Sequence, residues 1–159
     1  PVGMPLPNIP DALSKGTIEG CAIPWEVVPS VKVHELTKFH GEFPAGSPAL
    51  YTTTFVMAMN KAKYEGLAPE LKKVIDANSG LATSGWLGKT QQGNDAIGRK
   101  SATDRNNTIH TFSAAETQEF IRLSAQVDDD WVADMNKRGF KGEALLKAAK
   151  DLIAKHGRG

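Results

Sequence analysis

Prolines restrict the N-terminal stretch of this chain more tightly than any other feature of the sequence. Four of the first ten residues are prolines, at positions 1, 5, 7 and 10. Each proline locks its own φ, removes a backbone donor and biases the preceding residue away from the helical region. The stretch therefore predicts extended or turning chain, followed by a short helix that begins near Ile9 and stops at Gly16.

A second restricted point is Pro24, which follows a β-branched, apolar run. Residues 17–23 predict a short buried strand, although Glu19 and Gly20 interrupt the pattern. Trp25 comes directly after the proline, where ligand crevices form beside the ends of strands in open α/β sheets. Trp25 is therefore a candidate ligand contact, with an ordinary core residue as the equal alternative. A loose helical period continues from Trp25 to Phe39.

The middle of the chain contains its most strand-like run. Residues 49–59 are dense in β-branched and aromatic side chains, and apolar residues in both phases predict burial on both faces. An amphipathic helix is predicted over residues 64–75, broken or restarted near Pro69. Residues 80–105 are rich in glycine and polar side chains, and their pattern is balanced between loop and helix. Residues 106–112 predict an edge strand.

The C-terminal part of the sequence predicts two helices. Ser113 and Glu116 have the spacing of a capping box, in which each side chain accepts from the other residue's backbone. Apolar residues then recur every three or four positions until Gly139, which should end the helix. A last helix follows, with Lys155 near its C-terminus, where positive charge is favourable.

Charge and cysteine content exclude several classes of function. The formal net charge is +1 over 159 residues, so nucleic acid is not predicted as a partner. Cys21 is the single cysteine, which rules out an internal disulfide. No apolar run approaches the roughly 18 residues that a membrane-spanning helix needs.

None of the short motifs supports a cofactor or a metal. Gly88-Lys89-Thr90 lacks the glycine that a phosphate-binding loop needs five positions earlier, where Thr83 stands. Asp128-Asp129-Asp130 would point in different directions on a helix, and the histidines show no metal-ligand spacing. We therefore predict no cofactor, no metal and no catalytic residue.

Three segments carry a resemblance to a known family. They read PVGMPxxxxPxALSKGxIEG and xxPWEVVPS within residues 1–30, and FVMAMNK at 55–61. With these motifs the chain resembles TRAP transporter solute-binding proteins of the DctP type, which are periplasmic receptors that deliver organic acids to a membrane permease. The resemblance covers essentially the whole chain, is most specific over 1–29 and 55–76, and matches only the second half of such a receptor.

The resemblance implies an α/β fold: the C-terminal part of a two-lobed periplasmic binding-protein-like fold. This part is expected to be helix-rich, with a few sheet strands and long C-terminal helices. Residues 1–47 would form part of the second lobe and line the ligand cleft. Residues 48–112 would hold a hinge-crossing strand and return to the first lobe, and residues 113–159 would brace both lobes. A periplasmic location is expected from the resemblance alone.

The resemblance also implies a site for the acid. The candidate ligand-binding residues are Leu6, Ile23, Pro24, Trp25, Tyr51 and Thr52. Ile23, Pro24 and Trp25 match positions that line the family's cleft, and some members carry a polar amide where Ile23 stands, so an apolar or aromatic ligand body is expected. Leu6 matches a cleft position that is aromatic elsewhere. Tyr51 and Thr52 offer hydroxyls to a carboxylate, or are ordinary strand residues.

The family anchors the carboxylate with an arginine, whose fork matches it in geometry and charge. By the resemblance this arginine lies upstream of Pro1, so no arginine of this chain takes its role; those considered are Arg99, Arg105, Arg122, Arg138 and Arg158. The upstream half should also supply sheet partners for residues 49–59. Without that half we expect exposed apolar edges and dimerisation. The expected partners are an organic acid, the permease subunits and the upstream half, with no nucleic acid.

Two alternatives stay open beside a transport receptor. One is an α/β enzyme in which Cys21 pairs with His34 or His40 as a nucleophile. The other is an interaction module without a ligand, with a dry core around Trp25.

Overall fold

The computed structural model describes residues 2–157, which fall into two compact units. Of the described residues, 2–42 and 53–110 form the first unit, and 43–52 and 111–157 form the second. Pro1 and Arg158, both named above, lie outside the described residues. The chain thus passes from one unit to the other after Glu42, after Thr52 and after His110.

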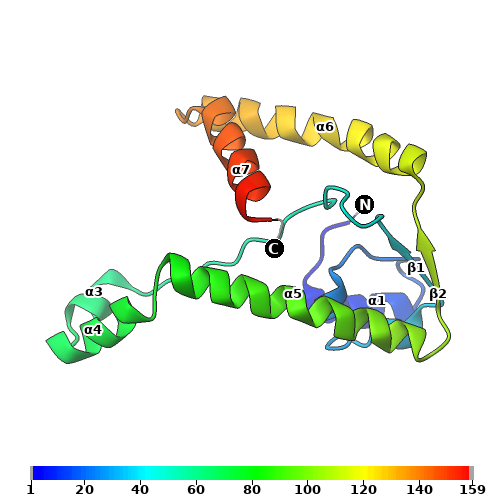
Figure 1. The fold of residues 1–159 in the computed structure, drawn as a ribbon, viewed down its shortest axis with the longest axis horizontal. Helices are drawn as coiled ribbons and strands as arrows, with labels where there is room; N and C mark the ends of the chain where they lie inside the picture. The colour runs from blue at the N-terminus through cyan, green and yellow to red at the C-terminus, as the bar shows by residue number, and fades with distance from the viewer. Residues whose placement is uncertain (1, 158–159) are drawn as a thin grey trace. The chain divides into compact units, whose positions relative to one another are not determined.

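Helices dominate both units (Figure 1). In chain order the elements are η1 (Leu6–Asn8), α1 (Ile9–Ser14), η2 (Trp25–Val27), α2 (Val33–Leu36), β1 (Phe39–Glu42), α3 (Lys61–Glu65), α4 (Pro69–Ala77), α5 (Leu81–Thr103), β2 (Thr108–Thr111), α6 (Ala114–Lys137) and α7 (Gly142–His156), where η marks a single 3-10 turn.

The proline-rich start folds as its sequence predicts. Pro10 lies in the first turn of α1, where its missing N–H costs nothing, and Gly16 follows the helix with a left-handed φ of 66°. Ile9, Val28 and Val33 are all buried in the first unit, as expected for neighbouring elements that pack together. Helix α1 lies against α2.

Two elements predicted before Glu42 are wrong. Residues 17–23 form no strand, because the one sheet among the described residues joins only β1 to β2. The helix predicted from Trp25 to Phe39 is divided into η2, a turn and α2, and Phe39 already belongs to β1. Lys32 adopts a left-handed φ of 54°, which interrupts the helical path between the pieces.

The strand predicted at residues 49–59 is also absent. No strand is assigned to these residues, and all of them are exposed; the Met57 side chain is 91% exposed. The prediction of burial on both faces is therefore wrong for the described residues. A strand is stabilised by a neighbour that pairs with its backbone, and the two-stranded sheet does not include this segment.

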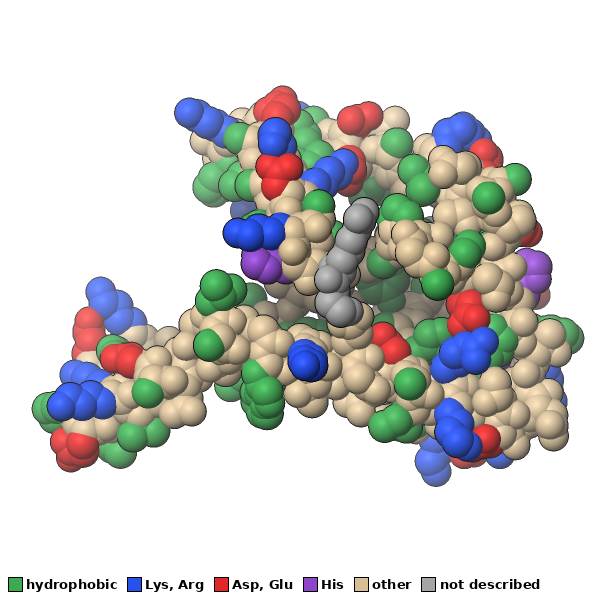
Figure 2. Space-filling model, in the orientation of Figure 1, with side chains coloured by type: hydrophobic (Ala, Val, Ile, Leu, Met, Phe, Trp, Pro, Cys, Tyr) green, Lys and Arg blue, Asp and Glu red, His purple; other side chains and the backbone are tan. Residues whose placement is uncertain are grey.

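Helix α5 is the long axis of the first unit. It runs without a break through the residues that the sequence left balanced between loop and helix. Figure 1 shows α3 and α4 near its N-terminal end, whereas η2 and α2 pack on it elsewhere. The break near Pro69 is confirmed, since α3 ends at Glu65 and α4 begins at Pro69. Hydrophobic side chains stand on the open surface of α5 (Figure 2), among them Leu81 and Trp86.

The second unit contains the two predicted C-terminal helices. Ser113 and Glu116 form the capping box at the start of α6, and Gly139, with a φ of 83°, follows its end. Phe43, Phe112 and Phe120 cluster with ring centroids 5.1–5.3 Å apart. Helix α7 packs on α6, and the close approach at Gly142 leaves no room for a side chain there.

Candidate functional site

The backbone of Trp25 is held against α5. A Cβ atom at Gly98 would lie 1.8 Å from the carbonyl oxygen of Trp25, so only glycine allows η2 to approach this closely. One residue further on, the Glu26 N–H donates to Oδ1 of Asp95 at 3.0 Å. Because Asp95 and Gly98 lie three residues apart on α5, they form one face that fixes the start of η2.

The indole of Trp25 lies beside the imidazole of His40 on β1. The two ring centroids are 5.3 Å apart, with an interplanar angle of 34°. Trp25 is half-buried, as are its neighbours Ile23 and Pro24. This part of the site therefore offers a partly exposed aromatic and apolar surface, supported from one side by His40.

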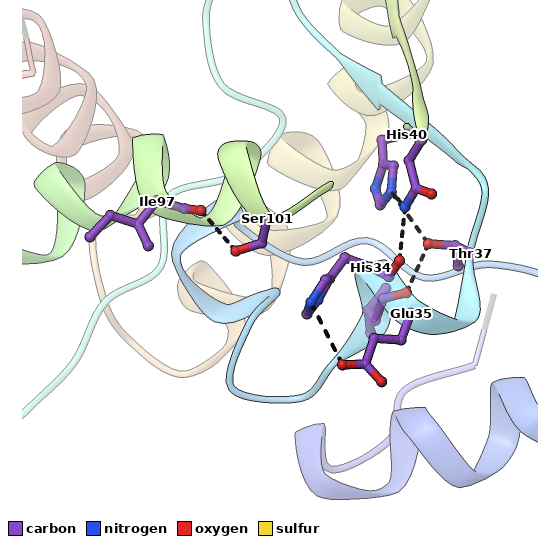
Figure 3. Close-up of polar contacts among 8 residues, drawn as sticks. His34, Glu35, Thr37, His40, Ile97 and Ser101 are labelled. Carbon is purple, nitrogen blue, oxygen red and sulfur yellow. Dashed lines mark hydrogen bonds and ion pairs between the residues drawn. The ribbon is translucent and has the colours of Figure 1, made fainter. Parts of the chain in front are cut away.

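A buried amide contacts the ring of His40, and Figure 3 draws the contact as a dashed line at the labelled ring. The side-chain nitrogen of Asn107 donates to the carbonyl oxygen of His34 at 2.8 Å and lies 3.1 Å from Nε2 of His40. A carbonyl oxygen only accepts, so the amide group facing both residues is the NH₂. Its second hydrogen then needs a lone pair on His40 Nε2. The neutral ring with its proton on Nδ1 is the state that fits.

Thr37 does not compete for this lone pair. Its hydroxyl donates to the carbonyl oxygen of Val33 at 2.9 Å, and its oxygen is 3.5 Å from His40 Nε2. That second distance is too long for a strong hydrogen bond. Burial lowers the pKa of His40, and the charge of nearby His34 lowers it further. Each effect favours the same neutral ring.

Leu6 lines a separate open cavity. The cavity has a volume of about 660 Å³ and lies between η1 and α1 on one side and residues 30–36 on the other. Pro7, Pro10, Val31 and Leu36 contribute apolar surface, but Ile23, Pro24 and Trp25 do not line it. The first unit thus does not bring Leu6 together with Trp25 in one cavity.

Tyr51 and Thr52 belong to the second unit, and both are exposed. Their assignment as ligand contacts stays a prediction, as it does for the other four candidates. The structure brings Ile23, Pro24 and Trp25 together only because they are consecutive.

His40, Asn107, Asp95 and Gly98 are the residues that sequence reasoning missed at this site. A signal was present for one of them, Asn107. Asn106 and Asn107 follow the end of α5, and Asn106 has a left-handed φ of 57°, which asparagine tolerates better than most residues. Gly98 sits in a helix among other glycines, and nothing local distinguishes it from Gly93.

Cys21 is a poor nucleophile in this setting. The residue is exposed, yet partial burial of its thiol raises the pKa. A reactive cysteine needs the opposite shift, toward the thiolate. Among the described residues, no group of three or more His, Cys, Asp or Glu side chains can hold a metal ion. Within residues 2–157, no helix combines the length and apolar character required to span a bilayer.

Comparison with known proteins identifies the class. The chain belongs to the bacterial extracellular solute-binding proteins, family 7 (DctP), whose family model matches residues 1–137. This confirms the family and the fold that the sequence predicted.

Two solved structures are similar enough to compare in detail. A TRAP solute-binding protein from Rhodoferax ferrireducens, in complex with copurified benzoate, is 64% identical with a TM-score of 0.94, covering 99% of this chain and 49% of that one. A marine metagenome TRAP solute-binding protein specific for aromatic acid ligands, in complex with metahydroxyphenylacetate, is 47% identical with a TM-score of 0.92. This second match covers 98% of this chain and 49% of that chain.

A more distant TRAP periplasmic solute-binding protein, from Desulfovibrio salexigens, is 24% identical with a TM-score of 0.72. It covers 100% of this chain and 49% of that chain, and it supports the fold alone. The chain therefore spans about half the length of the relatives that it matches.

Proposed function

We propose that this chain forms part of the solute-binding component of a TRAP-type transporter and helps to capture an aromatic carboxylate. The observation that carries the proposal is its 64% identity to a TRAP solute-binding protein that holds benzoate. The half-buried, apolar surface of Ile23, Pro24 and Trp25 suits the ring of such an acid.

The carboxylate would be bound by an arginine from the half of the receptor that this chain does not contain. Three arginines of the described chain are engaged in ion pairs. Arg99 forms a fork with Glu42, with N–O distances of 3.0 Å, and this contact raises the pKa of Arg99. Arg122 pairs with Glu119, and Arg138 pairs with Asp134.

The receptor would close around its ligand and then deliver it to the permease subunits. This role involves no chemical step, and the raised pKa of Cys21 weighs against the enzyme alternative. Membership of an extracellular solute-binding family supports a periplasmic location. The upstream half would be a structural partner, supplying neighbours for residues 49–59.

A fluorescence titration tests this function. We would titrate benzoate, 3-hydroxyphenylacetate and an aliphatic dicarboxylate into this chain and into the receptor with its upstream half restored. We expect saturable change with the two aromatic acids, in the restored receptor only. Ligand at a hundredfold excess over its dissociation constant should stabilise that receptor by about 2.7 kcal/mol.

Two of the three tryptophans provide a test variant and its matched control. Trp25→Phe should abolish the ligand-dependent change, whereas Trp86→Phe, on the open surface of α5, should retain it. A response to the dicarboxylate alone would refute the ligand class. The absence of any response in the restored, folded receptor would refute the proposed function.

A further inference from the structure

The backbone and the side-chain ring of Trp25 are held by different neighbours. The backbone is held by Gly98 and Asp95 on α5, whereas the indole has His40 as its aromatic neighbour. A side chain with a fixed backbone can still turn about its own bonds. His40 is therefore a contact that can restrict this turning of the indole.

His40 is in turn oriented from the end of α5. The backbone N–H of Asn107 donates to the carbonyl oxygen of Ala102 at 3.1 Å, and Asn107 is only 8% exposed. Its amide then bridges His34 and His40 (Figure 3). Ala102 lies one helical turn after Gly98. The same stretch of α5 therefore holds the Trp25 backbone, through Gly98, and Asn107, through Ala102.

We propose that His40 is a positioning residue for ligand binding: its imidazole, held as the Nδ1–H tautomer by Asn107, sets the orientation of the Trp25 indole. This inference rests on the proposed function, because it places Trp25 at the ligand.

Protonation of His40 would disrupt this arrangement. A hydrogen on Nε2 would face the N–H of Asn107, and the amide cannot turn over without setting its oxygen against the carbonyl oxygen of His34. Titratable groups on the elements around the ring include His34 and Glu35 on α2, His110 on β2, and Glu26 and Asp95 beside Trp25. On β1 itself, Glu42 pairs with Arg99. His34 and Glu35 form a contact of 3.9 Å between Nε2 and Oε1 (Figure 3).

The first test uses the ligand-free protein. Nitrogen NMR at about pH 8 should show His40 with its proton on Nδ1 and a lone pair on Nε2. Subtracting the fluorescence of Trp25→Phe from that of the wild type isolates the emission of Trp25. This emission should change as the pH falls from about 8 to about 5, and it should stay constant in a protein that also carries His40→Gln. His156→Gln, an exposed histidine at the end of α7, should leave the change intact.

The second test measures benzoate affinity in the restored receptor. His40→Gln should weaken binding by roughly three- to tenfold, as expected for loss of one aromatic contact. His40→Phe keeps a ring beside Trp25, so it should recover most of the affinity while losing the dependence on pH. Asn107→Ala should weaken binding less than His40→Gln at high pH.

The two tests separate this proposal from the proposed function. An Nε2–H tautomer, or a pH response unchanged in His40→Gln, would overturn the positioning role whether or not benzoate binds. Equal benzoate affinity and equal pH profile in the wild type and His40→Gln would also overturn it. If the wild-type receptor binds no aromatic acid, the proposed function fails while the NMR and fluorescence results still decide the role of His40 toward Trp25.

Discussion

At position 98 a hydrogen atom in place of a side chain lets η2 lie directly against α5. The neighbouring atoms are the backbone oxygen and carbon of Trp25, which cannot move aside as a flexible side chain can. The same helix carries Gly93, where an added Cβ would meet nothing within 4 Å. Close packing therefore requires glycine at position 98, whereas packing places no such requirement on position 93.

Gly98→Ala should destabilise the first unit by about 1–3 kcal/mol, because the added methyl group forces η2 away from α5. Gly93→Ala should instead stabilise the protein by about 0.5–1 kcal/mol, since alanine favours helix at an open position. Urea unfolding of both variants measures the difference. Equal effects of the two substitutions would show that the close approach at Gly98 is not important for stability.

The stability of the fold should depend on pH through His40. Folding lowers the pKa of this residue, so the unfolded chain takes up a proton first as the pH falls. The contribution of His40 to stability is therefore fully present above its unfolded pKa of about 6.5. It is lost as the pH falls from that pKa toward the lower pKa of the folded state. Unfolding midpoints at about pH 8 and about pH 5.5 should show a smaller loss in His40→Gln than in the wild type. A loss of the same size in both would contradict this prediction.

At the scale of elements, the termini of the long helices follow local chemistry. Glu116 accepts from the Ser113 N–H at 2.7 Å, and the Ser113 hydroxyl accepts from the Glu116 N–H at 3.2 Å. Both donors lie at the N-terminal end of α6, one on the N-cap residue and one in the first turn, where no intrahelical acceptor exists. The start of α6 is thus determined by four residues that are adjacent in sequence.

Ser113→Ala should lower the free energy of unfolding by about 1 kcal/mol, because the Glu116 N–H loses its acceptor. Ser124→Ala, in the middle of the same helix, should change it by less than about 0.5 kcal/mol, since alanine is the better helix former there. Thermal unfolding followed by circular dichroism compares the two. A larger loss at Ser124 than at Ser113 would contradict the role of the cap.

At the scale of the whole molecule, the described chain leaves one apolar segment on its surface. Residues 53–59 belong to the first unit and carry Phe55, Val56 and Met57, whose side chains are 66–91% exposed. Extended apolar chain of this kind pairs readily with another strand. We infer that this surface is covered when the upstream half of the receptor is present.

The chain should therefore self-associate when it is produced alone. Replacing Val56 and Met57 by lysine should lower the associated fraction, because charge on an exposed edge opposes pairing. Sedimentation velocity over a range of concentrations measures the association. Lys63→Ala, also exposed, serves as the matched control and should change little. A chain that stays monomeric at all concentrations would contradict the prediction.

The sequence by itself determined the features that depend on neighbouring residues. The short helix before Gly16, the break at Pro69, the capping box at Ser113 and the stop at Gly139 all formed as predicted, because each results from local backbone chemistry. The family motifs in residues 1–30 likewise identified the class of protein and its fold.

Only the tertiary structure decided which segments find a partner. Residues 17–23 and 49–59 have the composition of strands, but a strand also needs a neighbouring backbone, which the described chain does not supply to them. The setting of Trp25 was likewise beyond the sequence. Asp95, Gly98 and Asn107 are 70 to 82 positions away from it, and they reach this site only when α5 and the segment after it pack against η2, α2 and β1. Long-range packing therefore determined the site, because spacing along a chain does not encode which distant residues will meet.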